Sequence, residues 1–273
     1  MALPSTLRLV VVVLISAAAG AINSIAGGGT LLTFPALVGL GITPLVANAT
    51  STVALWPGSI ASMVGYRSEL AGAQRWAIGF AIPSLIGGGV GAWLLLRTPP
   101  SRFDTIVPWL VLGATALFIL QPRIVRAIQS RRADAIAEEG ASAALRDRTA
   151  DGSFPSPGVL VLQFFVGVYA GYFGAGAGII MLAALGLIGL TNIHRMNGLK
   201  NWGGLCANAV AAITFAFSSL ISWPIALAMA VGSVADGYLA SQGVQKVDQK
   251  HVRVIVILIG LAGGVWLLLN RHH

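Results

Sequence analysis

The chain has 273 residues, of which 56% are hydrophobic and only 10% are charged, and its mean hydropathy is +0.83. A soluble domain normally carries about 25% charged residues, so this composition excludes a water-soluble enzyme. Its 17 Lys and Arg against 9 Asp and Glu give a net charge of +8. Membrane proteins concentrate such an excess on cytoplasmic loops, so it does not indicate a nucleic-acid partner. The single cysteine, Cys206, allows neither an internal disulfide nor a cysteine-ligated zinc site.

Apolar stretches that suit membrane helices occur in two groups of five, judged against the roughly 20 apolar residues that one crossing needs. The first group covers residues 7–23, 30–41, 44–66, 76–96 and 106–120. The second group covers residues 158–173, 179–190, 196–217, 223–242 and 252–269 and has the same order of lengths. We therefore predict an all-α polytopic membrane protein.

The first stretch could also pass for a secretory signal peptide, because Arg8 precedes an apolar core that ends in small residues. Residues 19–41, however, resemble an internal segment of the second group. A cleaved leader should have no such counterpart, so we predict that the stretch is a membrane helix.

A polar stretch of mixed charge separates the two groups at residues 121–157. Its Ala and Glu content allows a short helix, and the sequence GSFPSP at 152–157 breaks that helix before the next apolar stretch. We predict three parts: a first transmembrane repeat at 1–120, a charged cytoplasmic linker at 121–157 and a second transmembrane repeat at 158–273.

A shift of 149 residues superimposes the two groups on each other. The identical positions around the glycine clusters include Ala21, Ala26, Gly27, Gly29 and Asn48, which match Ala170, Ala175, Gly176, Gly178 and Asn197. The pattern predicts a tandem duplication. Many secondary transporters have such repeats, with the substrate site at the repeat interface near the bilayer midplane. Many channels have them too, so the pattern favours transport over an enzyme.

The positive-inside rule bears on how the repeats are oriented. If each repeat crosses the membrane an odd number of times, the loops at 67–75, 121–157 and 243–253 are cytoplasmic and hold 11 Lys and Arg residues, against 4 outside. An even number of crossings gives 10 against 5, so both topologies obey the rule. Inverted repeats are favoured narrowly, and the linker is cytoplasmic in both.

Each half contains a glycine cluster between two apolar pieces, AGGG at 26–29 and GAGAG at 174–178. As helices, the pieces of the first half would reach about 25 and 18 Å, which is too much for one crossing and too little for two. We predict a discontinuous or re-entrant pair in each half. The N–H groups that start a helix attract anions. The candidate residues are Gly27, Gly28, Gly29, Thr30, Gly176 and Gly178. Alternatively, the glycines only allow close helix packing.

Two bases, Arg195 and Lys200, lie inside the core of the second repeat, where a charge costs about 2.5 to 3.5 kcal/mol on insertion scales. Arg195 could instead be a snorkelling residue at a helix end, and Lys200 could pair with the intramembrane acid Asp236. One acid cannot neutralise both bases, so a positive charge remains for a small anion. His194 and Asp236 could alternatively relay protons. We expect no metal site, since His194 stands alone.

Amide and hydroxyl side chains accompany these bases. Asn197 and Asn201 are four residues apart and share one helix face, and in the first half Asn48 is followed by hydroxyl residues that include Thr52. The predicted anion site therefore adds Asn48, Thr52, Arg195, Asn197, Lys200 and Asn201 to the glycines, with His194 and Asp236 as candidate coupling residues.

The segments NSIAGGGTLLTFP at 23–35, NATST at 48–52 and HRMNGLKN at 194–201 resemble the sulfite exporter TauE/SafE family of bacterial membrane proteins. The resemblance covers nearly the whole chain and implies about eight transmembrane segments in two related halves. It also implies transport of sulfite, sulfoacetate or related anions across the cytoplasmic membrane, usually outward. The chain departs from the pattern in its second half, where Ala184 stands at the position that would repeat Pro35.

Together, the residues and the resemblance predict a secondary transporter that exports a small sulfur-containing anion from the cell by alternating access. The predicted partners are this anion and the lipid bilayer, and no cofactor is expected. A passive anion channel and a membrane-embedded enzyme or processing factor are the alternatives. The oligomeric state cannot be predicted, because glycine-rich faces serve internal packing equally well.

Overall fold

The computed structural model describes residues 5–26, 28–139, 153–188, 190, 192–241 and 249–270. All regular structure in these residues is helical. The first half contains α1 (Ser5–Ala26), α2 (Thr30–Gly39), α3 (Pro44–Tyr66), the 3₁₀ helix η1 (Arg67–Leu70), α4 (Gln74–Arg97) and α5 (Pro100–Glu139). The second half contains α7 (Pro157–Tyr172), α8 (Ala177–Leu187), α9 (Ile193–Ala216), α10 (Trp223–Ser241) and α11 (Gln249–Leu269).

The helix boundaries follow local sequence signals. Proline occupies the first turn of α3 and of α7, where its missing N–H costs no helical hydrogen bond. Gly41 follows α2 with a φ of +84°, a conformation that glycine adopts without strain. The one large difference from the predicted segments is α5, which continues as a single helix to Glu139 through the first half of the predicted linker.

Close helix packing in the interior depends on small residues. A Cβ placed on Gly88 of α4 would lie 2.2 Å from the carbonyl oxygen of Ala207 on α9, and one on Gly171 of α7 would lie 2.2 Å from the carbonyl oxygen of Gly88. A Cβ on Gly58 of α3 would lie 2.6 Å from the carbonyl oxygen of Ser233 on α10. Glycine at these crossings lets the backbones touch, as is common between membrane helices.

Helices 149 residues apart occupy equivalent positions in the packing. α3 and α9 begin at residues 44 and 193, α4 and α10 at 74 and 223, and α5 and α11 at 100 and 249. α4 packs on α7 and α9, and the equivalent α10 packs on α1 and α3. In the same way α5 contacts α8, and α11 contacts α2. Each half therefore completes its packing with helices of the other half.

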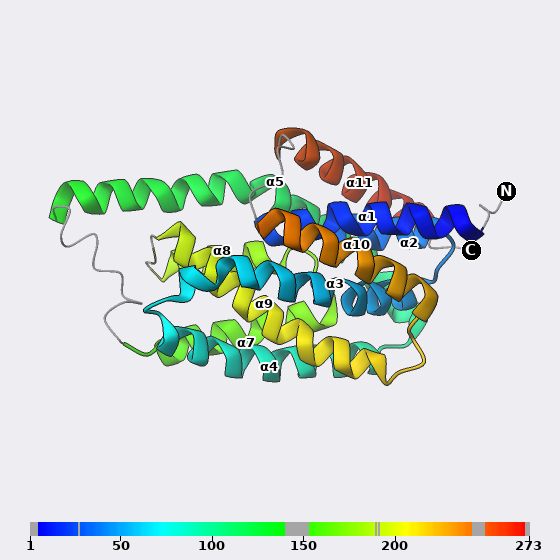
Figure 1. Cartoon of the computed structure of the whole chain (residues 1–273), viewed down its shortest axis with the longest axis horizontal. Coiled ribbons are helices and arrows are strands. Elements are labelled where there is room, and N and C mark those ends of the chain that lie inside the picture. The colour runs from blue at the N-terminus through cyan, green and yellow to red at the C-terminus, as the bar shows by residue number, and fades with distance from the viewer. Residues whose placement is uncertain are drawn as a thin grey trace.

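Equivalent helices also run in opposite directions. The residues that follow α3 lie against the start of α9, where Glu69 of η1 contacts His194 and Gly198. The start of α1 and the end of α11 lie at one end of the molecule, whereas η1, the end of α5 and the start of α7 lie at the other (Figure 1). We call these the terminus end and the linker end. The tandem duplication itself stays a prediction.

Both glycine clusters are places where a helix ends and the chain turns. The Arg8 side chain of α1 donates a hydrogen bond to the carbonyl oxygen of Leu40, just beyond α2, so α1 and α2 form a hairpin rather than one interrupted crossing. In the second half, the turn between α7 and α8 contains Gly174 and Gly176 with φ of +78° and +75°. Gly27 lies outside the described residues.

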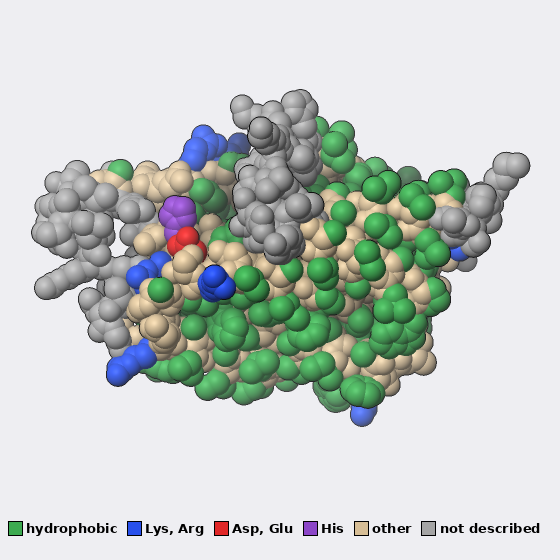
Figure 2. Space-filling model, in the orientation of Figure 1, with side chains coloured by type: hydrophobic (Ala, Val, Ile, Leu, Met, Phe, Trp, Pro, Cys, Tyr) green, Lys and Arg blue, Asp and Glu red, His purple; other side chains and the backbone are tan. Residues whose placement is uncertain are grey.

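The outer surface is apolar. Large hydrophobic side chains are exposed on many helices, including Leu14, Ile78, Trp109, Phe165 and Val231. Figure 2 shows hydrophobic side chains spread over the middle of one face, with charged side chains toward the ends. Within the described residues, Gln74–Arg97 and Pro100–Ser130 have the length and composition to cross a bilayer, and the other apolar helical stretches are shorter. The predicted all-α polytopic membrane fold is confirmed.

Candidate functional site

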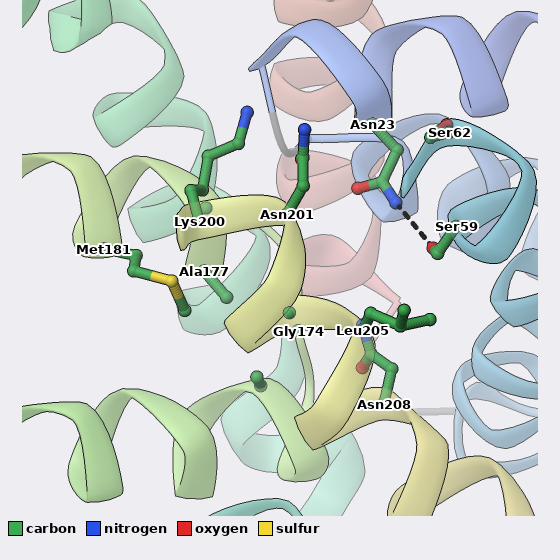
Figure 3. A pocket seen from close by; sticks show the side chains of 13 residues that line it. Asn23, Ser59, Ser62, Gly174, Ala177, Met181, Lys200, Asn201, Leu205 and Asn208 are labelled. Carbon is green, nitrogen blue, oxygen red and sulfur yellow. Dashed lines mark hydrogen bonds between the residues drawn. The ribbon is translucent and has the colours of Figure 1, made fainter. Parts of the chain in front are cut away.

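A cavity lies where α1, α3, α7, α8 and α9 meet. Polar side chains and small residues line it, together with Met181 and Leu205. The lining residues are Asn23, Ser59, Ser62, Ala170, Gly174, Ala177, Gly178, Met181, Lys200, Asn201, Gly204, Leu205 and Asn208 (Figure 3). Both halves of the chain contribute, so the cavity lies at their interface.

Lys200 supplies the positive charge among the described residues that line this cavity. It lies in the second turn of α9 and only 2% of its surface is exposed. In Figure 3 the Lys200 and Asn201 side chains extend from α9 in the same direction. A positive charge in the buried interior interacts strongly with an anion that comes near it, because the interior screens charges less than water does.

Asn201 and Asn208 of α9 line the cavity, and Asn197, one turn before Asn201 on the same helix, lies outside its lining. Asn197, Asn201 and Asn208 are separated by four and then seven residues, which places them on one helix face. The Oδ1 of Asn197 and the Nδ2 of Asn201 are buried and have no hydrogen-bond partner among the described residues. Buried polar atoms are nearly always paired with protein or water. The unpaired amide atoms therefore mark places for water or a bound solute.

The opposite side of the cavity belongs to the first half. The Nδ2 of Asn23, near the end of α1, donates to the Oγ of Ser59 on α3 over 3.4 Å. Ser62 lies three residues further along α3, on the same side of the helix. A solute in the cavity would thus meet amides and hydroxyls from one half and a cation from the other.

The glycine turn of the second half opens α8 directly beside the cavity. The hydroxyl group of Tyr169 donates to the carbonyl oxygen of Ala175 over 2.6 Å and holds the turn in place. Gly178 lies in the first turn of α8 and lines the cavity, while Gly176 lies behind it against Ala114. The first N–H groups of a helix have no acceptor within it, and they add positive potential at this point.

The glycine turn of the first half is tightly packed. A Cβ on Gly28 would lie 2.7 Å from the Phe118 ring, and one on Gly29 would lie 2.4 Å from the carbonyl oxygen of Ala19. Gly28 and Gly29 are buried, and Thr30 begins α2 beside them. None of the three lines the cavity, so of the glycines that the structure describes in the two clusters, only those of the second cluster line it beside Lys200.

Asn48 and Thr52 of α3 also lie away from this cavity. The Nδ2 of Asn48 donates to the carbonyl oxygen of Tyr172 over 2.9 Å, and the hydroxyl group of Thr52 donates to the carbonyl oxygen of Asn48 over 3.0 Å. Asn48 is completely buried. The sequence grouped these residues with Lys200, but the structure places Asn48 in a closed region between α3 and the end of α7 and leaves Thr52 partly exposed beside it.

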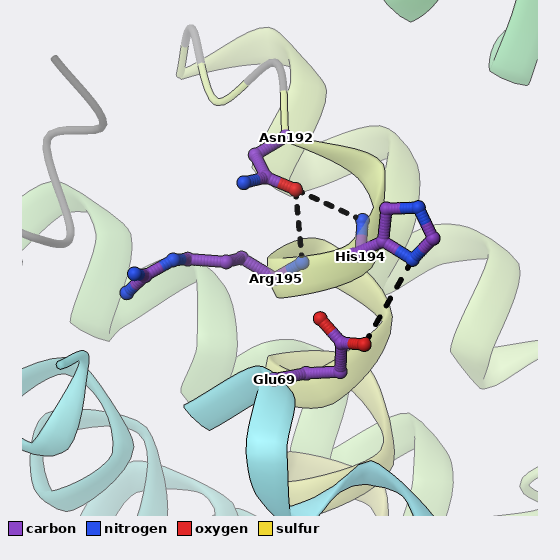
Figure 4. Close-up of polar contacts among 4 residues, drawn as sticks. All are labelled: Glu69, Asn192, His194 and Arg195. Atoms are coloured by element: carbon purple, nitrogen blue, oxygen red, sulfur yellow. Dashed lines mark hydrogen bonds and ion pairs between the residues drawn. The ribbon is translucent and has the colours of Figure 1, made fainter. Parts of the chain in front are cut away.

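The remaining predicted residues lie at the linker end of α9. Asn192 caps the helix by accepting hydrogen bonds from the N–H groups of His194 and Arg195 (Figure 4). The His194 side chain is 75% exposed and lies 3.9 Å from Glu69. The Arg195 guanidinium group lies beside Gly72 in the α3–α4 connection. Neither residue lines the cavity, and the Asp236 side chain lies outside the described residues.

Comparison with known proteins adds to this geometry. The family model "Sulfite exporter TauE/SafE" matches residues 12–267. The chain belongs to this family. It is 27% identical over 276 residues to "Probable membrane transporter protein YfcA" of Escherichia coli (strain K12), an alignment that covers 98% of this chain and 92% of the relative.

Two further relatives have the same kind of name. "Probable membrane transporter protein ORF9" of Sinorhizobium sp is 26% identical over 93% of this chain and 90% of its own length. "Probable membrane transporter protein" of Haemophilus influenzae is 26% identical over 87% of this chain and 86% of its own length. No solved structure gives a significant match. The family resemblance inferred from the sequence motifs is thus confirmed, and with it a place among membrane transporters.

In this family member, the structure brings together three of the residues that the sequence nominated, Gly178, Lys200 and Asn201. The predicted site did not include six polar or glycine residues of the lining: Asn23, Ser59, Ser62, Gly174, Gly204 and Asn208. Two signals could have identified some of them. Asn23 opens the first family-like segment, and Ser59 is the position that the shift of 149 residues pairs with Asn208.

Proposed function

We propose that the chain is a secondary transporter that exports a small sulfur-containing anion, sulfite or an organosulfonate such as sulfoacetate, across the cytoplasmic membrane. The observation that carries this proposal is the buried Lys200 in a cavity of amides, hydroxyls and a helix start. Sulfite and sulfonates have several oxygens that accept hydrogen bonds, and they have a negative charge that Lys200 would balance.

The arrangement of the halves supports alternating access. We infer that the halves are inverted repeats, because equivalent helices run in opposite directions and exchange packing partners. In transporters with such repeats, one unit rocks against the other around a site near the midplane. With the linker in the cytoplasm, as the distribution of Lys and Arg favours, Lys200 lies in the half of α9 that is nearer the cytoplasm.

Membrane potential would suffice to drive export. Moving one elementary charge through 100 mV releases about 2.3 kcal/mol, and a cell interior that is negative expels anions. A proton relay through His194 is not needed for this direction of transport. The exposed position of His194 gives it no contact with an anion in the cavity.

Counterflow in proteoliposomes tests the function. Proteoliposomes loaded with unlabelled sulfoacetate should accumulate labelled sulfoacetate and labelled sulfite. Taurine has an ammonium group in addition to its sulfonate, so it should compete poorly with these anions for transport. Lys200→Ala should reduce the flux about tenfold to a hundredfold, since a hydrogen bond to a charged group contributes about 1.5 to 3 kcal/mol. Arg195→Ala should have a smaller effect, and Arg97→Ala, which removes an exposed cation on α4, should have none.

Two results would overturn the proposal. Equal flux in wild type and Lys200→Ala would remove the charge assignment, and no flux of any of these anions would remove the function. Single-channel currents in a planar bilayer would instead favour a passive channel, whereas slow and saturable flux supports a carrier.

A further inference from the structure

α3 contains a buried row of polar side chains that no part of the proposed site uses. Asn48, Thr50 and Ser51 are all 0% exposed. The Oδ1 of Asn48 and the Oγ of Ser51 have no hydrogen-bond partner among the described residues. Leaving polar atoms buried and unpaired is costly, so a second conformation in which they meet water or a solute would relieve this cost.

The row lies at positions equivalent to those of the Lys200 cavity. The shift of 149 residues that relates α3 to α9 pairs Ser51 with Lys200 and Thr52 with Asn201. It also pairs Asn48 with Asn197, whose Oδ1 is likewise buried and unpaired. Because α3 and α9 run in opposite directions, the buried row lies on the terminus side of the middle of the molecule and the cavity lies on the linker side.

Tyr172 closes the buried row. Its carbonyl oxygen accepts from the Nδ2 of Asn48 over 2.9 Å, its hydroxyl group is 3.3 Å from that of Thr98 at the end of α4, and its ring lies 6.1 Å from the Phe103 ring of α5. These contacts join α3, α4, α5 and α7. The position equivalent to Tyr172 in the first half is Asn23, which lines the open cavity.

We propose that Asn48 and Ser51 form a second site for a small oxyanion, closed here by Tyr172 and opened toward the terminus end in the other state of the transport cycle. Opening the Tyr172 contacts frees the Asn48 amide to donate to the anion beside the Ser51 hydroxyl. Ser51 stands where the cavity has Lys200, so this site holds the anion with neutral donors only. It therefore binds the anion more weakly than the Lys200 cavity and favours its release.

This inference rests on the proposed transport function, and thiol labelling tests it separately. Cys206 is the chain's single cysteine, so Cys206→Ala provides a background for Ser51→Cys. In vesicles of known orientation, a membrane-impermeant thiol reagent should modify Ser51→Cys slowly. Adding Tyr172→Ala should speed the reaction about tenfold from the terminus side alone, since removing a hydrogen bond and a ring contact shifts a two-state equilibrium by about that factor.

Two cysteine variants make the comparison specific. Ser84→Cys is an equally buried position on α4 whose oxygen accepts from the Gln163 amide over 2.8 Å, and it should stay unlabelled with or without Tyr172→Ala. Ser62→Cys lines the Lys200 cavity and should be labelled from the linker side. Tyr172→Phe removes only the hydroxyl contact and should give a smaller rate increase, which keeps the test usable if Tyr172→Ala fails to fold.

Sulfoacetate should slow the labelling of Ser51→Cys in the Tyr172→Ala background, because the anion would occupy the site. The inference is overturned if Tyr172→Ala does not change the labelling rate of Ser51→Cys, or if the reagent reaches Ser51→Cys from the linker side. It is also overturned if sulfoacetate does not slow the labelling. The access measurement needs no substrate. If counterflow shows no transport but the labelling rate of Ser51→Cys still depends on Tyr172, the anion transport function is rejected. The conclusion that Tyr172 controls access to Ser51 would then still hold.

Discussion

The two halves of the molecule place polar side chains at equivalent positions with different results. α9 presents Lys200 and Asn201 to a cavity, whereas Ser51 of α3, the position equivalent to Lys200, lies in a closed region. The difference lies partly in neighbouring residues. The cavity has Gly204 and Asn23 where the closed region has the bulkier Leu55 and Tyr172. Side-chain volume and one cation thus distinguish two regions built on the same helical framework.

The strongest test of this comparison places a lysine in α3 at position 51, which is equivalent to Lys200 of α9. Ser51→Lys would bury a charge at a position that is 0% exposed, and an uncompensated buried charge costs about 3 to 5 kcal/mol. We expect a large loss of folded protein, measured by gel-filtration yield in detergent and by thermal denaturation. The control is Ser219→Lys, since Ser219 is exposed in the turn between α9 and α10. Equal stability of both variants would show that the α3 region is not closed.

The next test closes the cavity by making it resemble the α3 region. Gly204→Leu introduces the residue found at the equivalent position 55, and a Cβ on Gly204 meets no atom within 4 Å. The variant should fold normally while anion counterflow falls about tenfold or more, because the leucine fills space that the anion needs.

Gly113→Leu is the matched control for this substitution. A Cβ on Gly113 of α5 also meets no atom within 4 Å, and Gly113 is exposed on the outer surface. We expect unchanged counterflow. If Gly204→Leu transports as well as Gly113→Leu, the cavity is not the path of the anion.

A smaller effect is expected at the wall of the cavity. Asn23→Ala removes the 3.4 Å hydrogen bond to Ser59, and a neutral hydrogen bond of this kind contributes about 0.5 to 1.5 kcal/mol. The half-saturating anion concentration should rise a few-fold, as should that of Ser59→Ala. If the two side chains act through their mutual hydrogen bond, the double variant should be little worse than either single one. Fully additive effects would mean that each contacts the anion independently.

Much of the fold could be predicted because its determinants are local. Apolar stretches bounded by Pro44, Pro157 and the glycine clusters give helix positions to within a few residues. The extension of α5 to Glu139 was underestimated, because the polar composition after Gln121 indicates solvent and says little about helix continuity. The sequence predicted either a discontinuous or a re-entrant pair for α1 and α2. It could not distinguish them, since only the contact between Arg8 and Leu40 shows that the two helices form a hairpin.

The candidate site was predictable only in part. Lys200 and Asn201 stand out because a cation and amides are rare in apolar segments. Sequence cannot show which of two equivalent polar rows is closed, because closure depends on Tyr172 meeting Asn48, 124 residues away in the chain. Arg195 looked equivalent to Lys200 from composition, yet the Asn192 cap places Arg195 in the first turn of α9, beside Gly72.

The smallest effect is expected at His194, where η1, which follows α3, meets the start of α9. Its imidazole is 75% exposed and lies 3.9 Å from Glu69, and exposed ion pairs contribute about 0 to 1 kcal/mol. His194→Gln should therefore leave the counterflow rate unchanged, and the rate should depend on pH as it does in wild type. Glu69→Gln should behave alike. A pH dependence lost in both variants would instead assign proton coupling to this pair, and it would make the linker end, rather than the cavity, the place where the two halves differ most in function.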